Sequence, residues 1–305
     1  MLGYLGPEGT FTHQALLSFH REEARPYSSV IQALDAVRNR EVESVLVPLE
    51  NSMEGGVSAT LDNLASGQRL MITREVLLDV QFDLCVRPGT KFDDIRHVIT
   101  HPHAAAQTRN WIAQNLPKAD LTEGGSTAAA AKEVSNPDSK YDAAVCAAVA
   151  GDLYGLDHIA RNIADNPGAV TRFVLVGLPG RPPAPTGSDK TTLAVHLRED
   201  QPGALLEMLQ QFAMRGVNLC RIESRPTKEG LGSYYFSIDV EAHILDARMR
   251  ETAKGLHRIM GEIIFLGSYP RADHVRPKIG RGFSDKDFKA AKNWFIELVN
   301  PEERR

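Results

Sequence analysis

The chain has 305 residues, 42% hydrophobic and 24% charged, a composition typical of a globular protein long enough for two domains. Its net charge of −4 argues against nucleic acid or an anionic membrane surface as the main partner and leaves small molecules as candidate ligands. No apolar run reaches the roughly 18–20 residues that span a bilayer and no signal peptide is evident, so we expect a cytoplasmic protein.

The first half of the chain alternates expected strands with expected helices. Strands are expected at 2–5, 45–49, 97–100 and 170–176, and helices at 11–20, 30–40, 58–64, 104–116 and 128–134. Residues 70–87 alternate apolar and polar side chains and fit either a long strand pair or a crossing between two lobes, whereas residues 152–160 are expected to be a loop. A return strand after this long excursion predicts two α/β lobes, as in periplasmic-type binding proteins, with a ligand cleft between them.

Residues 6–10 form a glycine-containing loop between the first strand and the first helix, which Thr10 or Thr12 is expected to cap. A strand, a glycine loop and a helix N-terminus together favour an anion such as a carboxylate, because free N–H groups and the helix dipole face the ligand. The loop lacks the phosphate-binding motifs GxGxxG and Walker A. An ordinary turn is the alternative interpretation.

Polar residues also follow the second buried strand, where residues 50–56 read ENSMEGG. Ligands collect at the carboxyl ends of strands in α/β sheets, so Asn51 and Ser52 are candidate ligand contacts. They are equally suited to capping and turning the chain. Further along, either Ser126 or Thr127 is expected to cap the alanine-rich helix.

Thr171 and Arg172 stand at the start of the return strand. Neighbouring side chains of a strand point to opposite faces, so Thr171 and Phe173 share one face, and Arg172 either takes the other or marks the turn. An ordinary strand start with a surface ion pair is the alternative.

A proline-rich stretch after residue 178 separates the second half of the chain, which follows a βαββαβ plan. Strands are expected at 191–197, 217–223, 233–240 and 263–266, and helices at 204–215 and 244–260. This is the ferredoxin-like, α+β arrangement. A basic tail from residue 273 contains a further helix at about 288–298, which we interpret as a docking or oligomer helix.

The three cysteines, Cys85, Cys146 and Cys220, are scattered through apolar stretches. Their spacing does not suit a metal site, and we expect all three to be reduced core residues and no metal to be bound.

Several segments, in this order and spacing, resemble the prephenate dehydratase family. They are residues 6–11 (GPEGTF), 48–52 (PLENS), 101–102 (HP), 126–128 (STA) and 171–173 (TRF). Residues 203–206 (GALL) and 223–226 (ESRP) resemble the two segments with which ACT domains bind phenylalanine. Two positions depart from the family's usual residues: Ala169 stands where Asn is frequent, and His103 where Gln is common.

The resemblance implies a two-lobed catalytic domain and a regulatory domain. The implied boundaries are a catalytic domain at 1–178 (one lobe 1–78 with 160–178, the other 79–159), a linker at 179–189, an ACT domain at 190–272 and a tail at 273–305.

The resemblance also implies a carbon–oxygen lyase that converts prephenate to phenylpyruvate by decarboxylative dehydration, without metal or cofactor. Thr171 is expected at the departing hydroxyl, and Arg172 either holds a substrate carboxylate or pairs with Glu50 or Asp165. The expected substrate-binding residues are Thr10, Phe11, Asn51, Ser52, His101, Ser126, Thr127 and Phe173.

The ACT segments imply regulation by L-phenylalanine at a subunit interface of a homodimer or homotetramer. The expected effector-binding residues are Gly203, Ala204, Leu205, Leu206, Asn218, Glu223, Ser224, Arg225 and Pro226. Two alternatives stay open, namely dehydration of arogenate and a non-catalytic amino-acid sensor. An NAD-dependent dehydrogenase is disfavoured because the glycine fingerprint is missing.

Overall fold

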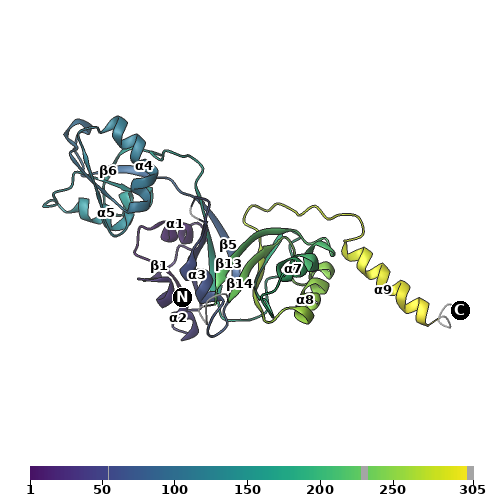
Figure 1. The fold of residues 1–305 in the computed structure, drawn as a ribbon. Helices are drawn as coiled ribbons and strands as arrows, with labels where there is room; N and C mark the ends of the chain where they lie inside the picture. The colour runs from purple at the N-terminus through teal and green to yellow at the C-terminus, as the bar shows by residue number, and fades with distance from the viewer. Residues whose placement is uncertain (54, 228–232, 301–305) are drawn as a thin grey trace. The chain divides into compact units, whose positions relative to one another are not determined.

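The structure is a computed structural model that describes residues 1–53, 55–227 and 233–300 (Figure 1). The chain divides into two compact units. One contains residues 1–60 and 76–175, and the other contains residues 61–75 and 176–305. Within the described residues, none of the helices is long and apolar enough to cross a membrane.

The first lobe is built on a sheet with the strand order β2-β1-β3-β11-β5, to which β4 adds by pairing with β3. Its strands are β1 (Leu2–Leu5), β2 (Ala24–Tyr27), β3 (Ser44–Asn51), β4 (Gly55–Gly56), β5 (Met71–Asp79) and β11 (Val170–Gly177). Its helices are α1 (Phe11–Leu17), α2 (Val30–Arg38) and α3 (Ser58–Leu64). Strand β1 runs parallel to both β2 and β3, so the loops after β1 and β3 leave the same edge of the sheet.

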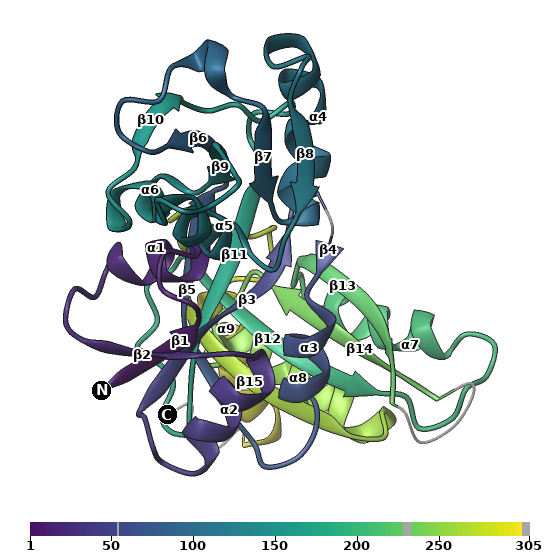
Figure 2. The same cartoon turned by 90° about the vertical axis from the view of Figure 1, so that its left-hand side faces the viewer.

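The second lobe has the strand order β10-β6-β9-β7-β8 (Figure 2). Its strands are β6 (Asp83–Val86), β7 (His97–Thr100), β8 (Asp120–Glu123), β9 (Ala143–Cys146) and β10 (Asp157–Ala160). Its helices are the 3₁₀ turn η1 (Phe92–Asp94), α4 (Pro102–Asn115), α5 (Thr127–Ser135) and α6 (Ala148–Leu153). The chain enters this lobe between β5 and β6 and leaves it between β10 and β11. The predicted two-lobed α/β fold is thereby confirmed, and residues 70–87 form a crossing between the lobes.

The expectation of a loop at residues 152–160 is wrong, because α6 and β10 occupy most of it. The imidazole of His158 on β10 fixes this region, with Nδ1 2.8 Å from Oδ2 of Asp83 and Nε2 3.0 Å from Oδ1 of Asp152. Strand β10 has no alternating pattern of its own, and it forms by antiparallel pairing with β6. Strands β2 and β8, which we did not predict, are equally short.

The second unit contains an antiparallel sheet with the strand order β13-β14-β12-β15. Its elements are β12 (Asp189–His196), α7 (Ala204–Ala213), β13 (Leu219–Pro226), β14 (Tyr234–Val240), α8 (Ala247–Ile259), β15 (Ile263–Pro270) and α9 (Asp285–Val299). Helices α7 and α8 pack on the sheet through one core that includes Met208, Phe212, Ile238 and Leu256. This order of elements confirms the predicted βαββαβ domain.

Two details of this unit differ from expectation. The helix expected from residue 244 begins at Ala247, because the Asp246 carboxylate accepts a hydrogen bond from the His243 N–H and turns the chain before the helix. Cys220 is exposed on β13, where the burial of successive residues alternates, and so it is not a core residue. Cys85 and Cys146 are buried. The pKa of the Cys146 thiol is raised, mainly by its hydrogen bond with Cys85 and secondly by burial.

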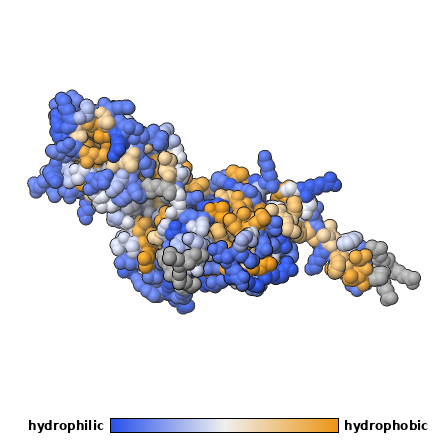
Figure 3. Space-filling model, in the orientation of Figure 1, coloured by the Kyte–Doolittle hydropathy of each residue, from blue (hydrophilic) through white to orange (hydrophobic). Residues whose placement is uncertain are grey.

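Helix α9 begins with a capping box in which Ser284 and Asp287 bond each other's backbone and side chain. The Asp285 carboxylate accepts a hydrogen bond from the Ala247 N–H, which attaches the start of α9 to α8. Helix α9, which the structure describes throughout, has no buried residue, and Trp294 and Phe295 are among its exposed apolar side chains. Figure 3 shows hydrophobic surface along this helix. Its role as a docking or oligomer helix stays a prediction, and residues 301–305 of the expected tail lie outside the described residues.

We predict that Gly151→Ala destabilises the second lobe. A Cβ at this position would lie 2.7 Å from the Cys85 sulfur and 2.8 Å from a ring carbon of His158, so the buried neighbours must shift. We expect a loss of about 1–3 kcal/mol in the free energy of unfolding, measured by urea denaturation. Gly180→Ala is the control, because its Cβ would meet nothing within 4 Å. Equal stability of the two variants would contradict this packing.

Candidate active site

A cavity of about 270 Å³ lies in the first unit, close to the lower end of the roughly 300–1,000 Å³ typical of ligand pockets. Strands β3 and β11 and the first turns of α1, α4 and α5 supply much of its wall. The described lining residues are Thr10, Phe11, Thr12, Pro48, Asn51, Val80, Phe82, His101, His103, Ala104, Gln107, Gly125, Ser126, Thr127, Thr171 and Phe173. The fold therefore brings eight of the ten predicted catalytic and substrate-binding residues to one cavity.

The cavity receives the N-termini of three of these helices. Thr10, His101 and Ser126 are the N-cap residues of α1, α4 and α5, and all three line the wall. Their side chains accept hydrogen bonds from backbone N–H groups of the first helical turns at 3.0–3.3 Å. First-turn N–H groups have no partners within their own helix, and the helix dipole adds partial positive charge. This arrangement favours an anionic ligand.

Charged side chains contribute little to the described part of the wall. Its ionisable members are His101 and His103, whose rings meet edge to face with centroids 4.8 Å apart. The remainder is neutral donors, small residues and aromatic rings, with Phe11 packed edge to face against Phe82. The cavity can therefore offer one polar and one apolar environment to the same ligand.

Asn51 at the end of β3 and Thr171 at the start of β11 are joined by a hydrogen bond. The amide Nδ2 donates to Oγ1 of Thr171 at 2.8 Å, while the amide oxygen Oδ1 accepts from the Met53 N–H at 2.8 Å. Because the backbone bond orients the amide, the Thr171 oxygen is the acceptor in this pair. Its own proton remains for donation, and it meets no hydrogen-bond acceptor among the described residues.

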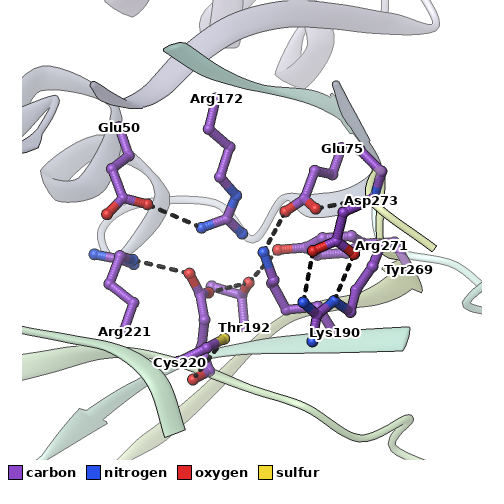
Figure 4. A network of polar contacts seen from close by, with 12 residues as sticks. Glu50, Glu75, Arg172, Lys190, Thr192, Cys220, Arg221, Tyr269, Arg271 and Asp273 are labelled. Carbon is purple, nitrogen blue, oxygen red and sulfur yellow. Dashed lines mark hydrogen bonds and ion pairs between the residues drawn. The ribbon is translucent and has the colours of Figure 1, made fainter. Parts of the chain in front are cut away.

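Two predicted residues, Ser52 and Arg172, are absent from the described lining. The Ser52 hydroxyl accepts from the Val170 N–H at 2.9 Å, and the Ser52 N–H donates to the Val170 carbonyl at 2.9 Å, so this residue ties β3 to β11. Arg172 is 5% exposed and its Nη1 lies 3.4 Å from Oε2 of Glu50 (Figure 4). The strand alternation thus places Thr171 and Phe173 on the cavity wall and directs Arg172 toward Glu50.

Thr10 also has a structural role, since its hydroxyl donates to the Pro7 carbonyl at 2.9 Å and closes the loop before α1.

The wall includes eight residues that we did not predict, namely Thr12, Pro48, Val80, Phe82, His103, Ala104, Gln107 and Gly125. Adjacent motifs were a signal for some of these, because Pro48, His103 and Gly125 neighbour predicted residues. Val80 and Phe82 lie in the crossing between lobes, where the sequence pattern gave no indication of a ligand.

Comparison with known proteins identifies the family. The family model for prephenate dehydratase matches residues 2–180, and the model for the ACT domain matches residues 191–258. The chain belongs to the prephenate dehydratase family. It is a hydro-lyase that acts on prephenate and carries a C-terminal ACT domain.

Individual relatives agree with this assignment. The prephenate dehydratase of Mycolicibacterium vanbaalenii is 43% identical over 290 residues, which cover 90% of this chain and 92% of the relative. A crystal structure of the Arthrobacter aurescens prephenate dehydratase in complex with L-Phe is 48% identical, with a TM-score of 0.92, and covers 98% of this chain and 99% of that one. GqqA, described as a quorum-quenching acylase, is 30% identical with a TM-score of 0.79, covering 88% and 97%.

The ACT residues predicted to bind an effector lie at the start of α7, just before β13 and on β13 itself. Gly203 is the N-cap of α7 with φ +92, in the left-handed region that glycine favours. Ser224 lines a cavity of about 260 Å³ together with residues 196–200. Asn218 donates to Oε2 of Glu241 at 2.9 Å. Leu205 and Leu206 are exposed apolar residues on α7.

We found no group of three or more His, Cys, Asp or Glu side chains arranged to hold a metal ion within residues 1–53, 55–227 and 233–300.

We predict that Arg172 acts through its ion pair with Glu50. Arg172→Gln leaves the Glu50 carboxylate without this partner, and because that side chain is 35% exposed to screening solvent we expect a loss of only about 1 kcal/mol in unfolding free energy. A double-mutant cycle with Glu50→Gln should show that the two losses are not additive. In steady-state kinetics, both single variants should raise the KM for prephenate by similar factors. A KM raised about 100-fold by Arg172→Gln alone would instead indicate direct contact with a substrate carboxylate.

Proposed function

We propose that Thr171 donates a hydrogen bond to the departing ring hydroxyl of prephenate and that Asn51 holds it in place. The observation that carries this proposal is the 2.8 Å bond in which the Asn51 amide donates to the Thr171 oxygen. It aligns the hydroxyl and leaves its proton for a ligand. Thr171 is 8% exposed and lies on the wall of a cavity of suitable size.

The reaction requires the site to assist the departure of the ring hydroxyl and to accommodate the loss of the ring carboxylate as CO₂. The C–C bond to the ring carboxylate breaks and its electron pair enters the ring, while the C–O bond breaks and the hydroxyl leaves with one added proton as water. The products are phenylpyruvate, CO₂ and water. A threonine hydroxyl is a weak acid, so Thr171 orients the departing hydroxyl and stabilises it by a hydrogen bond, the proton that this hydroxyl gains comes from solvent, and the gain of aromaticity drives the bond breaking.

The two carboxylates of prephenate need different surroundings. The carboxylate that is retained suits the N-termini of α1, α4 and α5, with His101, Ser126 and Thr127 as neutral or weakly basic contacts. The carboxylate that becomes CO₂ loses its charge, and apolar surroundings favour that loss. Phe11 and Phe173 would provide such surroundings beside the ring.

We infer that L-phenylalanine regulates the enzyme through the ACT domain. The Arthrobacter relative that crystallised with L-Phe supports this inference, as do the GALL and ESRP segments. The left-handed Gly203 exposes the first turn of α7 without a nearby side chain, which suits the approach of a small zwitterion. We propose an effector site completed by a second subunit in a homodimer or homotetramer, and the domain boundaries 1–178, 190–272 and 273–305 with a linker at 179–189.

We predict that Thr171→Val keeps the fold and lowers kcat by about 10²–10⁴-fold, because the side-chain shape is retained and the donor is lost. Thr171→Ser should retain activity within about tenfold, since it restores the hydroxyl. The kcat of Asn51→Ala should lie between those of Thr171→Val and Thr171→Ser, because the Thr171 hydroxyl remains but is no longer aligned. Phenylpyruvate absorbance measures turnover, and circular dichroism checks folding. Near wild-type turnover by Thr171→Val would remove Thr171 from the mechanism.

We predict that L-phenylalanine inhibits turnover and that the protein is at least a dimer in light scattering after gel filtration. Differential affinity of the effector for two quaternary states is the physical basis. Turnover is measured with three candidate substrates, namely prephenate, arogenate and an acylated amine. The acylated amine is included because of the similarity to GqqA. Preference for arogenate would revise the substrate, and a monomer with and without L-phenylalanine would contradict the interface site.

A further inference from the structure

We propose that helix α3 is the link between the effector segment of the ACT domain and Thr171, and that Asp62 attaches this helix to the ACT sheet. The inference rests on the proposed regulation by L-phenylalanine and names its route. Helix α3 runs from residues of one compact unit into residues of the other, so a displacement of its C-terminal turn is carried covalently to its start.

The C-terminal turn of α3 is held by two side chains of the ACT sheet. The Arg225 guanidinium, on β13, donates through Nε to Oδ1 of Asp62 at 3.0 Å, and the Tyr235 hydroxyl, on β14, donates to the same oxygen at 3.3 Å. The side chains of Arg225 and Asp62 are 18% and 16% exposed, so solvent screens their attraction only partly. The hydrogen bond to Asp62 is the main cause that raises the pKa of Arg225.

The start of α3 is held by the strand that forms the cavity. The buried hydroxyl of Thr60 donates to the Pro48 carbonyl at 2.6 Å, and the Val57 N–H donates to the Leu49 carbonyl at 2.8 Å. Just before the helix, Gly55 pairs with Asn51 through the β3–β4 ladder. Pro48 and Asn51 both line the cavity, and Asn51 orients Thr171.

Arg225 contacts two carboxylates at once, Asp62 and Glu223, and contact with Glu223 alone would be the second arrangement of the link. Its Nη1 lies 3.6 Å from Oε1 of Glu223, and Glu223 belongs to the same ESRP segment. An effector seated on residues 223–226 changes the balance between Asp62 and Glu223 as partners of this guanidinium. When Arg225 moves toward Glu223, α3 loses its charged contact with the ACT sheet and keeps the Tyr235 hydrogen bond, so the end of β3 holds the Asn51 amide on Thr171 less firmly. Coupling of this kind requires such a two-state element.

A neighbouring ion pair supplies a matched control. Arg69 pairs with Glu262, so it also ties the segment 61–75 to the ACT domain, but it lies beyond the end of α3. The side chains of Arg69 and Glu262 are both about half exposed, and loss of this ion pair should leave α3 in place.

The test compares Asp62→Asn with Glu262→Gln in the full-length enzyme. The readout is the ratio of kcat/KM for prephenate without and with saturating L-phenylalanine, alongside calorimetric binding of L-phenylalanine. We expect Asp62→Asn to bring this ratio to within twofold of 1, to lower basal kcat toward the inhibited wild-type value and still to bind L-phenylalanine. Glu262→Gln should keep the wild-type ratio and basal kcat.

Milder variants keep the inference testable if Asp62→Asn fails to fold. Tyr235→Phe removes one hydrogen bond to Asp62, and Thr60→Val removes the bond at the other end of α3; each should lower the ratio at least threefold. A wild-type ratio in Asp62→Asn, or in both milder variants, would overturn the link while leaving regulation intact. A wild-type enzyme that neither binds nor responds to L-phenylalanine would overturn the proposed regulation, and the link with it.

Discussion

The hydrogen bond from the Asn51 amide to the Thr171 oxygen joins residues 120 positions apart, and the architecture of the first unit is what brings them together. Strand β11 returns from the second lobe to lie beside β3 in the sheet of the first lobe. Ser52 and Val170 form two hydrogen bonds at this junction, one through the Ser52 hydroxyl and one through its backbone N–H, and so set the register of the two strands. A shift of one residue would turn Thr171 away from the cavity and bring Arg172 onto its wall.

An anionic substrate can be held here by backbone dipoles, with little help from charged side chains. The helices α1, α4 and α5 each follow a strand in the chain, namely β1, β7 and β8, and the N-cap residue of each lines the cavity. Thr10, His101 and Ser126 use their side chains as caps, which keeps each helix start fixed and its remaining N–H groups oriented. Fixed dipoles need no reorganisation as charge moves during the reaction.

The sequence was sufficient for features that depend on local pattern. Alternation placed Thr171 and Phe173 together, apart from Arg172, the polar loop at the end of a strand identified Asn51, and the start of the alanine-rich helix identified Ser126 as a cap candidate. Short strands such as β2, β8 and β10 escaped prediction because pairing with a neighbour, and no pattern of their own, makes them strands. Val80 and Phe82 reach the cavity through the path of the crossing. The pair of Asp62 with Arg225 spans 163 positions, a distance that no local rule covers.

The position of Arg172 suits the chemistry that we propose for the cavity. The reacting carboxylate carries a full charge in the bound substrate and loses it as CO₂ forms, so a guanidinium against it would stabilise the ground state more than the transition state. Such an arrangement would tighten binding and slow turnover. With Arg172 turned toward Glu50, and Thr171 on the wall, the strand keeps the strong cation away and presents a neutral donor. In the proposed mechanism, that donor acts at the departing oxygen, where hydrogen bonding strengthens as negative charge develops.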